Sequence, residues 1–164
     1  FYLSVGGNKN WGRTFSLSLK IQLDSQNKVK TDSEDGTMTK TTIGAKTRLG
    51  NFNFHGLLDS KSTTFNAAEK DYQSTMVDTG MSFVWTPWVF GINYQNTNQQ
   101  YKSVDPASNL VLKNKKDVMS LNIKYAYNNS KILGVDLKQI KQDSNDATKV
   151  FIDNQYVFQY IWMF

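Results

Sequence analysis

His55 is the only histidine of the 164-residue chain, and histidine is the side chain best suited to acid–base chemistry near neutral pH. It lies in the segment Asn53-Phe54-His55-Gly56-Leu57, two residues after the polar Asn53. Catalysis by a histidine also requires a nucleophile within reach and a carboxylate that orients the ring. No motif of that kind surrounds His55. We therefore interpret it as a hydrogen-bonded polar residue and predict no catalytic residue and no enzymatic activity.

Charged residues recur at alternate positions of several segments, so they would share one face of each segment if it were a strand. The cations are Lys20, Lys40, Lys46, Arg48, Lys124 and Lys138, and the candidate partners are Asp24, Asp59, Asp78 and Asp136. An unpaired buried charge is costly, so within a narrow interior these residues and His55 should form a salt-bridged polar network. The alternative is a pore lined by cations, which would prefer anions.

Two acidic clusters, at 32–35 and 143–146, offer oxygen ligands of the kind that divalent cations bind. Neither has the spacing of a calcium-binding loop, so we interpret both as solvated loops and predict no metal site. The chain has no cysteine, which excludes sites built from thiolates. We expect no cofactor.

The elements that must position these residues are strands, because apolar and polar residues alternate along most of the chain. The alternating segments are 14–24, 37–49, 51–60, 72–85, 88–98, 117–127, 131–142 and 155–164. No segment has a helical period, and none approaches the roughly 18 apolar residues of a membrane helix. We predict one all-β domain over 1–164, an antiparallel up-and-down barrel of eight strands. Residues 1–13 form an N-terminal segment or a partial extra strand.

The connections between these segments alternate in length. Gly50-Asn51, Thr86-Pro87 and Asn128-Asn129-Ser130 are tight turns, whereas the other connections are long and polar. We expect the long connections at roughly 25–36, 61–71, 99–116 and 143–153. Short turns on one side and long loops on the other are typical of transmembrane barrels.

The two faces of the predicted strands differ in side-chain size. Small residues such as Ser82, Gly91 and Ser120 lie in the polar set, while the apolar set is bulky. The interior of an eight-stranded barrel is barely wide enough for its own side chains, so the small polar set fits the inside and the bulky set fits lipid. A soluble barrel with its aromatic face inward is the alternative. An aromatic girdle at one membrane interface is expected from Trp85, Trp88, Tyr125 and Tyr127.

The last ten residues place an aromatic side chain at every second position and end in Phe: Tyr156, Phe158, Tyr160, Trp162 and Phe164. This pattern resembles the closing strand of bacterial outer-membrane β-barrels. Together with the turn pattern, the chain resembles the small eight-stranded class that includes the membrane domain of outer membrane protein A. The resemblance implies a location in the bacterial outer membrane. It also implies that these five residues are a β-signal read by the barrel-assembly machinery.

A looser similarity covers residues 88–164. Tyr101–Pro106, Lys115–Asp117, Ser144-Asn145 and the final Phe are similar to the C-terminal barrel of the surface lipoprotein assembly modifier family. That resemblance implies the C-terminal part of a larger transport or secretion barrel. A closed barrel formed by this chain alone would favour the first resemblance, and an open sheet would favour the second.

We therefore expect an integral outer-membrane protein with a polar, largely plugged lumen and with surface loops for binding or envelope integrity. Its expected partners are outer-membrane lipid and lipopolysaccharide. The net charge of +5 favours an anionic surface, and the run Lys113–Lys116 is a candidate contact for phosphates. The charge is too weak to imply nucleic-acid binding.

Overall fold

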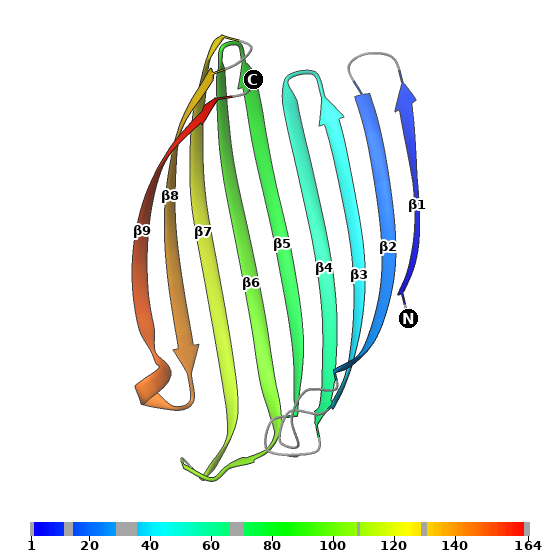
Figure 1. Ribbon diagram of the computed structural model, residues 1–164, viewed down its shortest axis with the longest axis vertical. Helices are drawn as coiled ribbons and strands as arrows, with labels where there is room; N and C mark the ends of the chain where they lie inside the picture. Colours follow the sequence, from blue (N-terminus) through cyan, green and yellow to red (C-terminus); the bar gives the residue numbers. More distant parts are fainter. Residues whose placement is uncertain are drawn as a thin grey trace.

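The computed structural model describes residues 2–11, 15–28, 36–65, 71–107, 109–128 and 131–162. These residues form one antiparallel sheet whose strands follow each other in chain order (Figure 1). The strands are β1 (Tyr2–Trp11), β2 (Phe15–Lys28), β3 (Gly36–Leu49), β4 (Phe52–Phe65), β5 (Tyr72–Trp85), β6 (Trp88–Asp105), β7 (Leu110–Asn128), β8 (Lys131–Ser144) and β9 (Phe151–Trp162). A 3₁₀ turn, η2 (Ala147–Lys149), precedes β9. The all-β, up-and-down prediction is therefore confirmed.

The described residues form nine strands, so the expected number of eight was wrong. The additional strand is β1, which pairs with β2 continuously from Tyr2↔Asp24 to Trp11↔Phe15. Gly6-Gly7 and the polar run 8–10 interrupt the apolar alternation of this segment. They do not interrupt its backbone ladder, because ladder hydrogen bonds depend on the main chain and not on the side chains.

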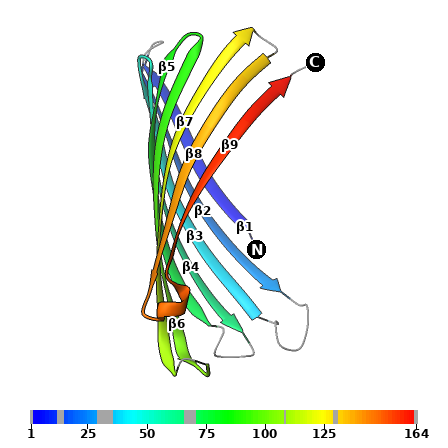
Figure 2. The same ribbon diagram turned by 90° about the vertical axis from the view of Figure 1, so that its left-hand side faces the viewer.

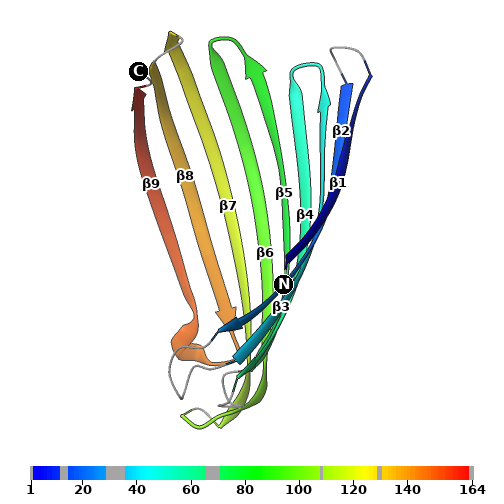
Figure 3. The same ribbon diagram turned by 45° about the vertical axis from the view of Figure 1, so that its right-hand side comes forward.

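The sheet is twisted and curved (Figure 2), as the right-handed twist of strands requires. It is open: among the described residues, β1 pairs only with β2, and β9 pairs only with β8. The two edge strands lie on opposite sides of the sheet (Figure 3). With nine strands in alternating directions, β1 and β9 run parallel to each other.

Short and long connections alternate as expected, but the long ones are shorter than the sequence pattern indicated. The strands β6 and β7 are 18 and 19 residues long and pair as far as Asp105↔Leu110, through most of the region expected to be a loop. A register shift between Gln100 and Val104 marks the point where this extension begins. In Figure 1 the β6–β7 hairpin reaches beyond its neighbours.

The two faces of the sheet are chemically different. Consecutive cross-strand partners from β3 to β8 form one polar row: Lys46, His55, Gly80, Asn93, Ser120 and Lys138. Three residues closer to the short turns, an apolar row crosses the other face from β4 to β9: Phe52, Phe83, Phe90, Ile123, Val135 and Phe158. The row nearest the short turns continues this face with Trp85, Trp88, Tyr125, Leu133 and Tyr160.

Burial follows the curvature of the sheet. Along β5 the polar-face residues are half-buried, whereas the apolar Val77 and Met81 are exposed. The sheet curves around its polar face, where neighbouring side chains cover one another; we call this the concave face and the other the outward face. Among the described residues the buried apolar side chains are few: Leu112, Val118 and Ile140. Within the described residues, no helix has the length and apolar character needed to cross a membrane.

Candidate functional site

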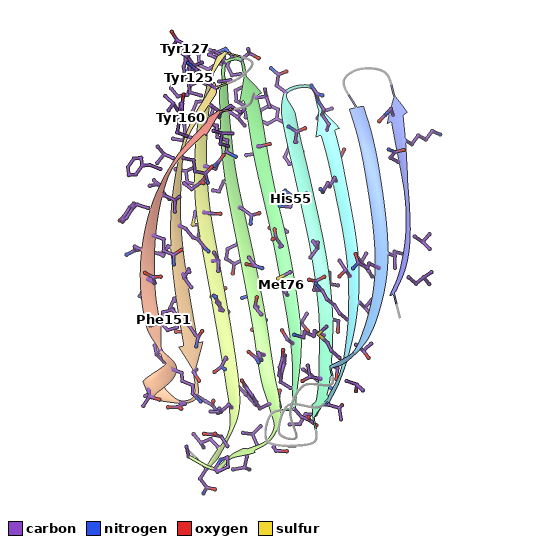
Figure 4. All side chains as sticks on the ribbon, viewed as in Figure 1. His55, Met76, Tyr125, Tyr127, Phe151 and Tyr160 are labelled. Atoms are coloured by element: carbon purple, nitrogen blue, oxygen red, sulfur yellow. The ribbon has the colours of Figure 1, made fainter. Side chains whose placement is uncertain are left out.

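The strand register brings the residues expected in the polar network onto the concave face. Lys40, Lys46, Arg48, His55, Asp59, Asp78, Lys124, Asp136 and Lys138 all occupy positions on this face. The backbone of Lys20 pairs with Gly44 of the same face, but the Lys20 side chain lies outside the described residues. Figure 4 shows His55 and Met76 in the middle of the sheet.

One ion pair joins β3 and β4. The Lys40 ammonium lies 2.9 Å from Asp59 Oδ2, and the Asp59 side chain is only 9% exposed. The pair forms diagonally, because Asp59 lies directly opposite Thr42, two residues along β3 from Lys40. A half-buried pair of this kind compensates part of the desolvation that each charge suffers.

His55, Asp78 and Asn93 form a polar cluster across β4, β5 and β6. His55 Nε2 lies 3.1 Å from Asp78 Oδ1. The side-chain amide nitrogen of Asn93, oriented toward β5, donates hydrogen bonds to Asp78 Oδ1 at 3.0 Å and to the backbone carbonyl of Thr79 at 2.8 Å. Gly80 lies directly opposite both His55 and Asn93, and a Cβ at Gly80 would collide with both side chains. The glycine is what allows the imidazole and the amide to meet.

Two other residues of the predicted network have partners that the sequence did not indicate. Arg48 Nε donates to the carbonyl of Gly50 at 3.1 Å and so braces the β3–β4 turn. Asp136 accepts hydrogen bonds from the amides of Asn122 and Gln159, the latter at 2.7 Å. Asn93, Asn122 and Gln159 were missed as site residues. Their positions on the polar side of the alternation were the available signal.

Three cations of the concave face, Lys46, Lys124 and Lys138, form no ion pair among the described residues. Lys46 and Lys138 are exposed. Beside them a basin of about 500 Å³ opens over β3 to β7, and Lys46, Arg48 and His55 line its wall. The small residues Ser82 and Gly91 also line it. The basin is cationic and open to water.

The outward face carries the aromatic residues expected at a membrane interface. Trp85, Trp88 and Tyr127 are 62%, 39% and 68% exposed. Tyr125 packs against Trp88 with ring centroids 4.7 Å apart. Tyr125, Tyr127 and Tyr160 gather at the short-turn end of the sheet (Figure 4).

The residues expected to form the β-signal lie on β9. Tyr156, Phe158 and Tyr160 occupy its outward face, with exposures of 69%, 80% and 58%. The backbone of Trp162 pairs with Lys131. The side chain of Trp162, and Phe164 altogether, lie outside the described residues.

Nowhere in the described part of the chain do three or more His, Cys, Asp or Glu side chains lie close enough to hold a metal ion. Both carboxylates of the acidic cluster 143–146 form ion pairs with nearby lysines: Asp143 pairs with Lys141, and Asp146 pairs with Lys149. The cluster 32–35 lies outside the described residues.

Asp146 caps the 3₁₀ turn between β8 and β9. Its Oδ1 accepts hydrogen bonds from the hydroxyl of Thr148 at 2.7 Å and from the backbone N–H of Thr148 at 3.0 Å. These hydrogen bonds, aided by the Lys149 ammonium, hold the pKa of Asp146 below its ordinary value. The carboxylate therefore stays charged and fixes this connection.

Comparison with known proteins assigns the family. Residues 2–148 match the family model described as Gram-negative porin, which covers most of the chain. No curated protein and no solved structure matches the chain. The match does not single out the small eight-stranded class that the terminal strand resembles. An antiparallel sheet with one apolar and one polar face is what a porin wall requires. The chain belongs to the Gram-negative porin family, whose members are β-barrel proteins of the bacterial outer membrane.

Proposed function

We propose that this chain forms part of the wall of a water-filled pore that admits small polar solutes and prefers anions. The observation that carries the proposal is a set of three concave-face cations, Lys46, Lys124 and Lys138, that form no ion pair with any described residue. In a sealed interior each would need a counter-ion, because an unpaired buried charge is costly. Facing water, they need none. We expected a plugged lumen for eight strands, but a plugged lumen would require these cations to be paired.

The open sheet favours the wider of the two barrels that the sequence suggested. In a membrane the free backbone groups of β1 and β9 must find partners, because lipid offers none. Strands outside this sheet would pair with the two edges and enlarge the lumen, since barrel diameter grows with strand number. Most residues of the expected long loops lie in strands. We therefore assign the function to the wall of the pore rather than to its loops.

The proposal assigns no catalysis to His55. Its Nε2 faces a carboxylate and an amide, which orient a ring but do not attack a substrate. No hydroxyl nucleophile bonds to this imidazole among the described residues. The cluster instead fixes polar groups on the pore wall.

Ion selectivity tests the pore. Purified protein in planar bilayers, under a KCl gradient, should conduct and give a reversal potential of anionic sign. Neutralising Lys46, Lys124 and Lys138 together with Gln should shift that potential toward cation preference. The matched control is Lys141→Gln on the outward face, where Lys141 pairs with Asp143 at 3.2 Å, and it should change nothing. Absence of conductance, or equal shifts in both variants, would refute the proposal.

We also propose lipopolysaccharide as a surface partner. A polar groove of about 430 Å³ lies on the outward face at the long-connection end, with Lys113 and Lys115 on its wall. The Lys115 side chain is 52% exposed, and its ammonium lies 3.4 Å from Asp117 Oδ2, so a phosphate would share this lysine with Asp117. Replacing both lysines with Gln should reduce the thermal stabilisation that added lipopolysaccharide gives, whereas Lys138→Gln should not. Equal stabilisation of all three proteins would count against this partner.

The barrel-assembly machinery is proposed as a second partner, acting on the terminal strand. The support is that Tyr156, Phe158 and Tyr160 present an exposed aromatic row on the outward face of β9. β9 has a free backbone edge in this sheet, which is the geometry that strand addition requires.

A further inference from the structure

The basin over β3 to β7 is built from two neighbouring rows of cross-strand partners on the concave face. The row nearer the short turns consists of Arg48, Asn53, Ser82, Gly91 and Asn122. The next row consists of Lys46, His55, Gly80, Asn93 and Ser120. All of them except Gly80 line the basin, and no carboxylate is among the described residues that do so. The basin therefore suits a solute that carries negative charge.

The permanent positive charges of the basin lie at its β3 end. Lys46 is exposed and forms no ion pair with any described residue. Arg48 is also exposed, and its Nε donates to the Gly50 carbonyl at 3.1 Å, which leaves the terminal nitrogens of the guanidinium for an anion. The two residues are roughly 7 Å apart along the strand. Two cations at this spacing suit the two negative charges of a phosphate monoester.

The amides of the basin offer acceptors rather than donors. Each of the three amides that line it directs its nitrogen to an acceptor within the protein. The pairs are Asn53 with Ser82 Oγ at 3.4 Å, Asn93 with Asp78 Oδ1 at 3.0 Å, and Asn122 with Asp136. The amide oxygens are left for a solute, and an oxygen of this kind binds a hydroxyl donor but not a bare anion.

Side-chain bulk falls between the cations of β3 and Asn122 of β7, at Ser82 and Gly91. A Cβ at Gly91 would lie 3.6 Å from Asn122 Cβ and 3.9 Å from Asn122 Oδ1, which are ordinary contacts. The oxygen of this amide therefore lies beside the glycine. Neighbouring strands are roughly 4.8 Å apart, so about 14 Å separates β3 from β6. This span accommodates a phosphate over β3 and β4 followed by one sugar ring over β5 and β6.

The serines of β2 that pair with Lys46 and Arg48, Ser18 and Ser16, have side chains outside the described residues. The hydroxyl-binding part of the basin lies on β4 to β7, away from β2.

We propose that this basin is a binding subsite for monosaccharide phosphates, with the phosphate on Lys46 and Arg48 and the sugar hydroxyls on the amide oxygens. The inference rests on the proposed pore, through which the solute reaches the concave face. It adds a substrate class, because cations alone would favour every small anion. The acceptors select those anions that also carry hydroxyl donors.

Three probes separate the two parts of the subsite. Glucose 6-phosphate carries both the charge and the hydroxyls, inorganic phosphate lacks the sugar, and glucose lacks the charge. Ligand-observed NMR on the purified protein in detergent micelles, at about pH 7.5 where the monoester is doubly charged, measures each affinity. Glucose 6-phosphate should bind about tenfold more tightly than either of the others, since each lacks one set of hydrogen bonds. Equal binding of glucose 6-phosphate and inorganic phosphate, or binding of none of the three, would overturn the proposal.

One pair of lysine variants tests the charged end. Lys46→Gln should weaken the binding of glucose 6-phosphate about tenfold and leave that of glucose unchanged. The matched control is Lys116→Gln, because Lys116 is an exposed lysine of the concave face outside the basin, and it should change neither affinity. Equal weakening by both exchanges would show a diffuse effect of charge and refute the site.

One pair of glycine variants tests the place of the sugar. Gly91→Val should abolish the binding of glucose 6-phosphate, because the added side chain occupies part of the basin. Gly134→Val makes the same exchange on the same face outside the basin, where a Cβ also meets only ordinary contacts of 3.5 Å and more, and binding should persist. Binding that survives Gly91→Val would refute the subsite. Conductance without sugar phosphate binding would reject the subsite alone, and binding without conductance would reject the pore alone.

Discussion

The outward and concave faces of this sheet share one backbone, yet they differ in which side chains are exposed: apolar residues on the outward face are exposed, and polar residues on the concave face are half-buried. On β7 the outward Leu121 is 42% exposed, and its neighbour Ser120 lies half-buried on the concave face. A water-soluble protein would reverse this relation and bury the leucine. The difference shows that the two faces meet different solvents. Exposed apolar residues here mark contact with lipid, and a polar interior marks contact with water.

The aromatic rows are the clearest example of exposed apolar side chains on the outward face. Phe52 of β4 and Phe83 of β5 are cross-strand partners with ring centroids 4.8 Å apart. Such pairs contribute about 0.5–1.5 kcal/mol beyond the area they bury. The concave face carries one such cross-strand pair, Tyr72 and Tyr101, whose ring centroids lie 5.9 Å apart, and ion pairs and amide hydrogen bonds also join its strands.

The largest expected effect comes from placing one charge on each face of β7. Leu121→Arg puts a guanidinium against the middle of the lipid layer and should lower the free energy of unfolding by about 2–4 kcal/mol. Ser120→Arg puts the same group toward water and should change stability by only about 0.5 kcal/mol. Urea titration of both variants refolded in lipid vesicles measures the difference. Equal losses would mean that the two faces share one environment.

The terminal strand should show a smaller and more specific effect. Replacing Tyr160 and Trp162 with Ser, or removing Phe164, should impair insertion in cells more than it impairs refolding in detergent. The reason is that recognition by the assembly machinery is lost as well as packing. Surface-exposed protein in cells and refolding yield in detergent give the two quantities. Equal loss in both would show that the strand is only structural.

Much of this comparison could be predicted from the sequence, because a period of two reports which residues share a face. The assignment of Lys46, His55 and Lys138 to one face needed only that parity. Which residues touch one another depends on cross-strand register, which no single strand encodes. Asp136 therefore bonds to Asn122 and Gln159 rather than to a lysine.

Alternation of apolar and polar residues also fails to predict a strand where both faces of that strand meet water. The β6–β7 extension, with its run Asn98-Gln99-Gln100, carries polar residues on both sides, so the sequence indicated a loop. The apolar alternation of the β1 segment breaks at Gly6-Gly7, so the sequence left open whether residues 1–13 form an N-terminal segment or a partial extra strand, whereas the structure has a ten-residue strand there. In both places the ladder of backbone hydrogen bonds continues where the side-chain pattern stops.

The smallest expected effect lies outside both faces, at Asp146. Its pKa is lower in the folded chain than the ordinary value of 3.8. Its stabilising contribution is therefore fully present above about pH 4 and is lost as the pH falls through the lowered pKa of the folded protein. The amide resonance of Thr148 should report loss of the cap only in that acidic range, and Asp146→Asn should remove the transition. A transition of Thr148 near neutral pH would contradict the capping role.

Because the chain has no cysteine, single cysteines can report directly which solvent each face meets. Cysteine would replace Ser120, Leu121, Ile123 and Lys124 one at a time, in protein reconstituted into lipid vesicles, followed by a charged maleimide that does not enter lipid. The account predicts modification at positions 120 and 124 and protection at 121 and 123. Modification of the outward positions, or protection of all four, would contradict a lipid-facing outer wall around a water-filled pore.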